Sequence, residues 1–192
     1  MKNKKPNSCR VFLRICSSHF GPIAILWSDF SGLPKIFRIV LSKPNVSATQ
    51  RLSECFPHAI SETCSEIDAV ADGIEGFLNG EDIQFSLKIV TMDLCSHFQQ
   101  KVLHAEHEIP RGSVSTYHRI ARHVGNPKGA RAVGNALAHN LFPLIVPCHR
   151  AIRTDRSLGG YQGGFQMKRT LLEMEGIEFD GTARVVSNTF FY

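Results

Sequence analysis

Two β-type runs stand near the start of the chain, with turn-forming residues between them. Residues 23–27 and 36–41 consist mainly of Ile, Leu, Val, Trp and Phe. The segment that separates them carries Ser, Asp, Gly and Pro, which favour turns over regular structure. Two such runs around a turn segment predict a β-hairpin.

An amphipathic helix is predicted after the hairpin. Between residues 67 and 78, apolar side chains recur at the spacing of one helix face. Asn79-Gly80 supplies a stop, because glycine lets the backbone turn through positive φ. Residues 85–90 then predict a further strand. We therefore expect residues 1–90 to form an α/β domain, a small sheet with a helix.

The second half of the chain has a helical pattern from Phe98 onward. Ser115 is placed to cap a helix that reaches about Val124, and Gly125-Asn126-Pro127 then forces a turn. A second helix is predicted from about Lys128 to Asn140. Two short helices around a glycine-containing turn are typical of a helix-turn-helix, although many structural helix pairs share this pattern.

The second of these helices consists mostly of small residues. Between positions 129 and 138, Gly and Ala occupy six places, and Arg131 is the one large basic side chain near the start. Small residues let a helix approach another surface closely, and tight packing against the first helix would account for some of them. We expect residues 91–180 to form a mostly helical, winged helix-turn-helix-like DNA-binding domain, followed by a C-terminal tail at 181–192.

Charge is distributed unevenly along the chain, whose formal net charge is +5. Residues 1–98 carry ten Lys or Arg against ten Asp or Glu, and residues 170–192 carry one against four. Residues 99–169 carry eleven against three, a net charge of +8. A basic block of this kind suits a phosphate backbone. Charge alone is equally consistent with a solvated basic surface that binds no nucleic acid.

The apolar segments and the cysteines indicate the compartment. No apolar run approaches the roughly 20 residues that a bilayer span requires, and no export signal is evident. The cysteines include no CxxC pair, so we expect reduced thiols in a cytoplasmic or nuclear-accessible protein. The six cysteines are Cys9, Cys16, Cys55, Cys64, Cys95 and Cys148.

The most informative stretch is residues 143–150, where an apolar run ends in Pro147 and delivers Cys148 beside His149 and Arg150. A thiolate is a nucleophile, and nearby positive charge or a paired imidazole lowers the thiol pKa. On an extended segment neighbouring side chains point opposite ways, so a water molecule could carry the proton between thiol and imidazole. A Cys-His dipeptide taken alone is weak evidence for catalysis.

The context of this dipeptide resembles one known family. Pro147-Cys148-His149-Arg150, preceded by residues 131–135 and followed by residues 159–164, is similar to the O6-alkylguanine-DNA alkyltransferases, also called methylated-DNA–protein-cysteine methyltransferases. The resemblance covers residues 92–178 in ordered motifs. The outer motifs are residues 98–99, 109–117, 125–127 and 171–176.

The resemblance implies four residues at the reaction centre. Cys148 would accept the alkyl group, and His149 would take the thiol proton through a water molecule. Glu175 would hold the imidazole in one tautomer, as carboxylates do beside other catalytic histidines. Asn140 would order this network.

Five further residues are implied in substrate binding. Tyr117 matches the tyrosine that rotates the 3′ phosphate, and Arg131 matches the arginine that fills the gap left by the flipped base. Tyr161 would hydrogen-bond the guanine and help it leave as a neutral base. Gly163 and Pro143 fall at pocket-lining positions.

The function implied is a single, irreversible transfer of an alkyl group from O6-alkylguanine in double-stranded DNA, after base flipping. Whether O4-alkylthymine is also accepted stays open. Displacement at an alkyl carbon needs only a thiolate, a leaving base and alignment, so we expect no cofactor. We expect a monomer that binds no membrane.

The chain also departs from the family pattern. Leu103 stands where the family usually has tryptophan, which puts the packing of its helix in doubt but not the chemistry. Some relatives bind an N-terminal zinc ion through Cys and His. Cys9, Cys16 and His19 have no spacing typical of zinc ligands, so we expect no metal.

Two other interpretations are weighed against alkyl transfer. A non-catalytic binder of alkylated DNA, a sister class in which the acceptor cysteine is replaced, is opposed by the presence of Cys148. A helix-turn-helix regulator with Cys148 as a redox sensor would explain the basic block. It would not explain the Tyr-Gln-Gly-Gly motif or Glu175.

Overall fold

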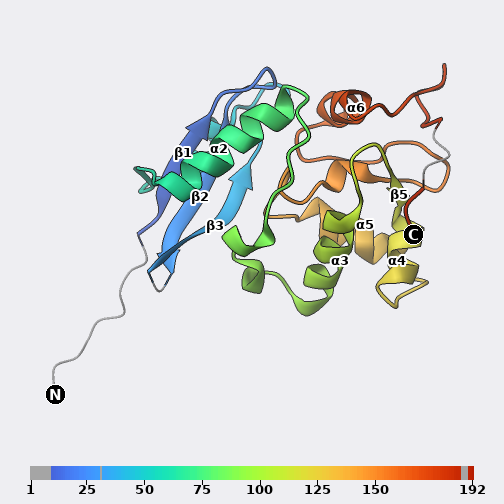
Figure 1. The fold of residues 1–192 in the computed structure, drawn as a ribbon, viewed down its shortest axis with the longest axis horizontal. Coiled ribbons are helices and arrows are strands. Elements are labelled where there is room, and N and C mark those ends of the chain that lie inside the picture. Colours follow the sequence, from blue (N-terminus) through green and yellow to red (C-terminus); the bar gives the residue numbers. More distant parts are fainter. Residues whose placement is uncertain (1–9, 31, 187–189) are drawn as a thin grey trace.

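A four-stranded sheet forms the N-terminal part of the protein (Figure 1), whose computed structural model describes residues 10–30, 32–186 and 190–192. The strand order is β3-β2-β1-β4, with β1 and β4 parallel and the other neighbours antiparallel. The strands are β1 (Phe12–Cys16), β2 (Ile23–Phe30), β3 (Leu33–Val40) and β4 (Ile60–Ser61).

The predicted hairpin is confirmed as β2 and β3, which pair from Ala24–Val40 to Phe30–Leu33. Side chains that alternate along a strand face opposite sides of the sheet. Ile23 and Ile25 therefore join the main core on one side, while Ala24 and Leu26 pack on the other. Each face of the sheet is covered by one helix.

The two covering helices are α1 (Ala48–Cys55) and α2 (Ser65–Leu78). Helix α2 lies across the sheet in Figure 1, and it confirms the predicted helix. Its buried residues Ile67, Ala71, Ile74 and Leu78 recur every three or four positions. The helix ends at Asn79, and Gly80 follows with a φ of +97°, the left-handed conformation that glycine adopts without steric cost.

The prediction of a strand at residues 85–90 is wrong. The segment instead contains a short 3₁₀ turn, Leu87–Ile89, and only Val90 forms a β-bridge, with Ile36. Phe85, Leu87 and Ile89 alternate because these side chains pack against the core from an extended connection. One-sided packing produces the same period of two as a paired strand.

The second half is mostly helical and also contains a small parallel pair of strands. Helix α3 starts where the pattern predicts, and β5 pairs with β6. The elements are α3 (His97–Glu108), β5 (Ser115–Thr116), α4 (Tyr117–His123), α5 (Ala130–Ala138), β6 (Ala151–Ile152) and α6 (Phe165–Met174). In the described residues, no helix is long and apolar enough to cross a membrane.

Helices α4 and α5 pack against each other around the predicted turn. Gly125 has a φ of +79°, and the N–H of Asn126 donates to the carbonyl of Ala121 over 2.8 Å. The predicted cap, Ser115, is one residue too early, because α4 begins at Tyr117. The hydroxyl of Thr116 accepts instead, from the N–H of Arg119 over 3.1 Å.

The two halves share one hydrophobic core. A single cluster contains Ile25 and Ile74 from the N-terminal part together with Val102, Leu103 and Cys148 from the second half. The N–H of Ile39 in β3 also donates to the carbonyl of Leu141 over 2.8 Å. The division of the chain near residue 90 therefore stays a prediction.

The end of the chain packs against the second half. The N–H of Phe191 donates to the carbonyl of Val114 over 2.9 Å, and the hydroxyl of Ser115 donates to the carbonyl of Phe191 over 2.8 Å. The Tyr192 ring stacks on His123. Residues 190–192 therefore lie against β5 and α4.

Glu106 is a charged residue type at a core position. Its side chain is fully buried in α3, and no donor among the described residues hydrogen-bonds either carboxyl oxygen. Burial raises the pKa of Glu106 to about 8, although Lys168 and Arg150 oppose the shift. The carboxyl is therefore mostly neutral at pH 7, because an ionised carboxylate without hydrogen bonds is costly in the interior.

We expect Glu106 to lower stability as pH rises. The folded pKa, about 8, exceeds the ordinary value of 4.5, so the folded state holds this proton more tightly. The parent should lose on the order of 4 kcal/mol between pH 4.5 and 8 relative to Glu106→Gln. Urea unfolding of both proteins at pH 5 and pH 8 measures this difference. An identical pH dependence in the two proteins would contradict it.

Candidate active site

The segment that carries Cys148 is a buried turn and not an extended strand. Pro147 precedes a 3₁₀ turn, Cys148–Arg150, whose three residues are all buried. The apolar run before it is closed by a hydrogen bond of 2.8 Å from the N–H of Val146 to the carbonyl of Phe142. The turn directs the side chain of Cys148 toward Asn140 and that of His149 toward Glu175. The described atoms include no hydrogen bond between these two side chains.

Cys148 is held by Asn140 and is only 5% exposed. The Asn140 amide donates to Sγ of Cys148 over 3.3 Å and to the carbonyl of Val146 over 3.1 Å. Its oxygen accepts from the N–H of Phe142 over 2.9 Å, so the amide cannot rotate freely. This geometry aims an N–H at the sulfur, where a thiolate would accept it.

Burial keeps the thiol of Cys148 protonated. It raises the thiol pKa to about 11, and the hydrogen bond from Asn140 opposes that shift. A buried thiolate without a counter-charge is unfavourable, so the resting residue is a neutral thiol at pH 7. Nucleophilic chemistry at this sulfur therefore needs a base that removes the proton.

Glu175 lies at the end of α6 between His149 and Arg150. Its Oε1 is 2.9 Å from His149 Nε2, and Arg150 donates to both carboxylate oxygens over 2.8 to 3.2 Å. Burial alone would raise the pKa of Glu175. The hydrogen bonds and charges of His149 and Arg150 instead bring it down to about 2. The carboxylate is therefore ionised.

This carboxylate decides which nitrogen of His149 carries the proton. Burial lowers the pKa of the imidazole, so the ring is neutral near pH 7 despite the opposing effect of Glu175. An ionised carboxylate only accepts hydrogen bonds, so Nε2 must donate to it. Nδ1 then keeps its lone pair, and no described residue hydrogen-bonds to this buried nitrogen. His149 is thus a neutral base with a free acceptor.

A cavity of 440 Å³ contains Cys148. Tyr117 and Tyr161 also line it, and burial raises the pKa of Tyr117 to about 12 and the pKa of Tyr161 well above its ordinary value. Both hydroxyls are therefore hydrogen-bond donors at neutral pH. The remaining lining residues are Lys43, Gly134, Leu137, Ala138, Arg153, Gly159, Gly160 and Gln162.

Gly159 is required where it meets Tyr117. A Cβ at this position would lie 2.8 Å from the Tyr117 hydroxyl, and the residue has a φ of +70°. A side chain there would displace the tyrosine and strain the backbone. The Tyr161 hydroxyl is buried without a hydrogen-bond partner among the described residues.

The remaining predicted site residues lie apart from the cavity lining. Pro143 and Gly163 are buried but do not line the cavity that contains Cys148. Beside Gly163 the space is taken by Met167, whose sulfur would lie 2.1 Å from an added Cβ. Arg131 is exposed on the first turn of α5.

Two buried cations, Arg150 and Lys168, are not among the residues that the sequence predicts for the site. Arg150 holds Glu175 and also donates to the carbonyl of Ile109 over 2.6 Å. Lys168 is fully buried and donates to the carbonyl of Ala151 over 2.6 Å, and burial lowers its pKa to about 8. Arg150 could have been suspected from its place in the apolar Cys148 segment, since buried arginines need carboxylate partners.

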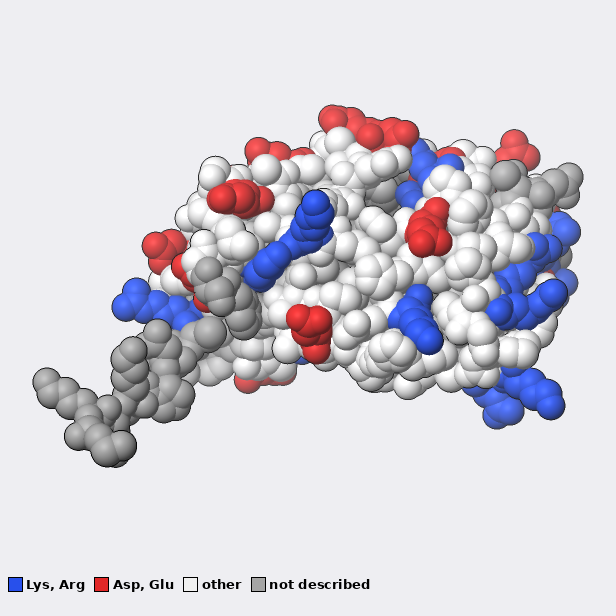
Figure 2. Space-filling view, turned by 60° about the horizontal axis from the view of Figure 1, so that its bottom comes forward, with Lys and Arg blue, Asp and Glu red and all other residues white. Residues whose placement is uncertain are grey.

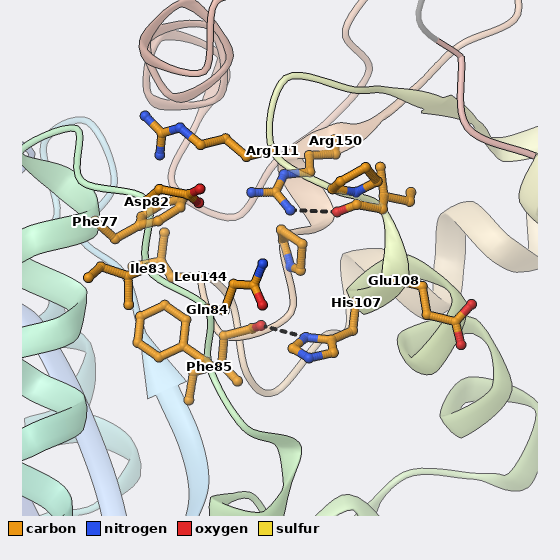
Figure 3. A pocket seen from close by; sticks show the side chains of 14 residues that line it. Phe77, Asp82, Ile83, Gln84, Phe85, His107, Glu108, Arg111, Leu144 and Arg150 are labelled. Carbon is orange, nitrogen blue, oxygen red and sulfur yellow. Dashed lines mark hydrogen bonds between the residues drawn. The ribbon is translucent and has the colours of Figure 1, made fainter.

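A second cavity of 390 Å³ lies behind this segment (Figure 3). Figure 3 shows Arg150 and His107 on its wall, each hydrogen-bonded to a backbone carbonyl, with Phe77, Ile83 and Phe85 opposite. The Phe77 ring centroid is 5.8 Å from that of His149. Phe77 of the N-terminal part therefore packs near the His149 imidazole.

The described residues hold no group of three or more His, Cys, Asp or Glu side chains placed to bind a metal ion. Cys16 is buried in β1 and His19 is exposed, while Cys9 lies outside the described residues. The five described cysteines form no disulfide.

Sequence comparison identifies relatives of this chain. The model of a family described as "6-O-methylguanine DNA methyltransferase, DNA binding domain" matches residues 97–177. A methylated-DNA–protein-cysteine methyltransferase from Methanosarcina acetivorans is 42% identical over 86% of this chain and 99% of its own length. One from Methanothermobacter thermautotrophicus is 43% identical over 60% of this chain. That match spans 64% of the relative, and several others span a similar share.

Solved structures agree with this relationship. The crystal structure of Mycobacterium tuberculosis O6-methylguanine methyltransferase superposes with a TM-score of 0.67 at 32% identity, covering 86% of this chain and 92% of that one. Mycobacterium tuberculosis OGT in complex with DNA gives the same TM-score and identity, covering 86% and 93%. The small sheet and the helices are therefore arranged as in these proteins.

We expect Arg150→Met to destabilise the fold by about 3–5 kcal/mol. The substitution leaves the buried Glu175 carboxylate with His149 but without its cationic partner. Arg153→Met is the matched control. Arg153 is exposed three residues later, so this change should stay within about 0.5 kcal/mol. Urea unfolding at pH 7 compares the two variants. Equal stability would mean that Arg150 does not hold the carboxylate.

Proposed function

The chain belongs to the methylated-DNA–protein-cysteine methyltransferase family, and on this basis we propose that it repairs DNA by moving an alkyl group from O6-alkylguanine onto Cys148. The observation that carries the proposal is a buried neutral thiol that is followed in the chain by a neutral histidine with an unoccupied acceptor nitrogen. Cys148 lies in a cavity that Tyr117 and Tyr161 also line, and Glu175 leaves only Nδ1 of His149 free to accept a proton.

The reaction begins with removal of the thiol proton. A water molecule passes the proton of Cys148 to Nδ1 of His149, and the ionised Glu175 stabilises the imidazolium that forms. Asn140 donates to the thiolate as it develops. The proton and its counter-charge stay within the buried site, which offsets part of the cost of a thiolate there.

Alkyl transfer is a direct displacement. The sulfur of Cys148 attacks the alkyl carbon, the C–S bond forms, and the bond from carbon to O6 breaks with its electron pair on guanine. The guanine takes up the proton that the thiol released, and Tyr161 donates a hydrogen bond that helps it leave. The product is a thioether on Cys148. No group in the site can reverse that bond, so each chain reacts once.

Access to the cavity requires base flipping. A thiol that is only 5% exposed cannot reach an atom inside a stacked duplex. We propose that α4 and α5 act as a winged helix-turn-helix on double-stranded DNA, with the small residues of α5 in the minor groove. Arg131 on α5 would fill the space that the guanine leaves, and Tyr117 would turn the 3′ phosphate. Pro143 and Gly163 would support the pocket from behind.

The surface charge supports a nucleic-acid partner. Figure 2 shows Lys and Arg side chains gathered toward one end of the molecule. A further cavity of 820 Å³ there is lined by α4 residues and by Arg156. Its basic α4 residues are His118, Arg119, Arg122 and His123. A surface of this kind attracts a phosphate backbone.

We propose that the protein acts as a monomer and without a cofactor, in the compartment that holds the DNA. This would be the cytoplasm, or the nucleus in a eukaryotic cell. A redox-sensing regulator is the less suitable alternative. Sensor cysteines have accessible thiols with a lowered pKa, whereas Cys148 is buried and its thiol pKa is raised to about 11.

Intact-mass measurement tests the proposed reaction. After incubation with excess duplex that contains O6-methylguanine, each chain should gain one methyl group, and peptide mapping should place it on Cys148. Cys148→Ala should gain none while it still binds duplex DNA. Several turnovers per chain, or methyl on another cysteine, would refute the proposal.

The role of Arg131 can be separated from the chemistry. Arg131→Ala should slow repair of duplex DNA, because the flipped state loses the side chain that fills the gap. A free-base substrate such as O6-benzylguanine needs no flipping, so its rate should stay close to the parent rate. His149→Ala should slow both reactions, because proton removal from the thiol is common to them. Equal loss of both activities in Arg131→Ala would refute this role for Arg131.

A further inference from the structure

One residue of the N-terminal part lines the cavity that contains Cys148. Lys43 follows β3 and shares the cavity wall with Tyr117, Cys148 and Arg153. Among the described residues, it is the one lining residue that precedes α4 in the chain. The proposed reaction gives this residue no role. Its position shows that the N-terminal sheet reaches the substrate site.

The backbone that presents Lys43 is a closed turn. The N–H of Lys43 donates to the carbonyl of Val46 over 2.9 Å, and the reverse bond measures 3.1 Å. Pro44 restricts the first turn position, and Asn45 adopts the left-handed conformation with a φ of 68°. Asparagine is among the residue types that tolerate this conformation. A turn fixed in this way loses little further entropy when a ligand binds.

The same turn is packed against the second half of the protein. Pro44 lies so close to Gly164 that an added Cβ there would be 3.1 Å from its ring. Just before the turn, the Ser42 hydroxyl accepts from the N–H of Ala48 over 3.0 Å and donates to the carbonyl of Pro22 over 2.6 Å. These contacts hold Lys43 at the cavity.

The charge of the cavity indicates what Lys43 meets there. Lys43 and Arg153 are the two charged residues in the lining, and both are cationic and exposed. The hydrogen bonds and salt bridges of the described residues include none made by the Lys43 ammonium group. An ammonium group free of internal partners is available to an anion. A nucleotide that enters this cavity from a duplex brings phosphodiesters on both of its sides.

We propose that Lys43 binds a phosphodiester of the DNA strand that carries the target nucleotide while that nucleotide occupies the cavity. The turn after β3 is then part of the DNA-binding surface. This inference rests on the proposed alkyl transfer. It adds a contact from outside the helix-turn-helix, made only once the nucleotide has left the stack.

The test compares Lys43→Met with the parent on two substrates. Methionine keeps the apolar stem and removes the charge. The rate of methyl transfer from an O6-methylguanine duplex should fall about three- to tenfold, and the log–log salt slope of binding to that same modified duplex should weaken by about 0.9. The rate with a free base such as O6-benzylguanine, which has no phosphate, should change less than about twofold. Lys43→Arg should restore most of the duplex rate.

Lys88→Met is the matched control. Lys88 is an exposed lysine of the N-terminal part that does not line this cavity, so its duplex rate and salt slope should match the parent. An unchanged duplex rate and salt slope in Lys43→Met would overturn the inference, and so would equal losses on duplex and free base. Failure of the proposed function looks different, because the parent itself would then transfer no methyl group.

Discussion

The shared carboxylate of Glu175 is the interaction on which the site depends. Burying a carboxylate costs several kcal/mol unless hydrogen bonds replace its lost hydration, and here His149 and Arg150 provide them. Arg150 also donates to the carbonyl of Ile109, which follows α3. One ion pair thus ties the end of α6, the Cys148 turn and the end of α3 together. Because the carboxylate can only accept, it also sets the proton on one nitrogen of His149.

Burial shifts the pKa values of the proposed proton donor and acceptor in opposite directions. It raises the pKa of the Cys148 thiol and lowers the pKa of the His149 imidazole, so both are uncharged at rest. The site therefore holds a thiol that reacts poorly with small electrophiles in solution. Proton transfer creates a thiolate and an imidazolium together, beside a carboxylate that is already ionised. Under the proposed single transfer this restraint is useful, because every unwanted reaction at the sulfur would consume one chain.

The N-terminal sheet supports this chemistry without supplying the reacting groups. Its core is continuous with that of the second half, and Phe77 of α2 packs near the His149 ring. Strand β3 donates a hydrogen bond to Leu141, next to the residue that holds the sulfur. The turn after β3 then brings Lys43 to the cavity. The N-terminal part thus contacts the second half beside His149, beside Asn140 and at the cavity.

Local patterns in the sequence predicted the β2–β3 hairpin, α2 and the α4–α5 pair, because each depends on contacts between near neighbours in the chain. The family motifs predicted Cys148, His149 and Glu175 as site residues without any knowledge of their positions in space. Strand β1, which has a parallel partner far along the chain, was not predicted. The alternation at residues 85–90 gave a wrong strand prediction, because it came from packing of one side of an extended connection against the core. Only the tertiary structure decided that Arg150 meets a carboxylate 25 residues away and that Lys43 reaches the cavity. Residue types and spacing do not determine which side chains far apart in the sequence come into contact, because those contacts depend on how the whole core packs.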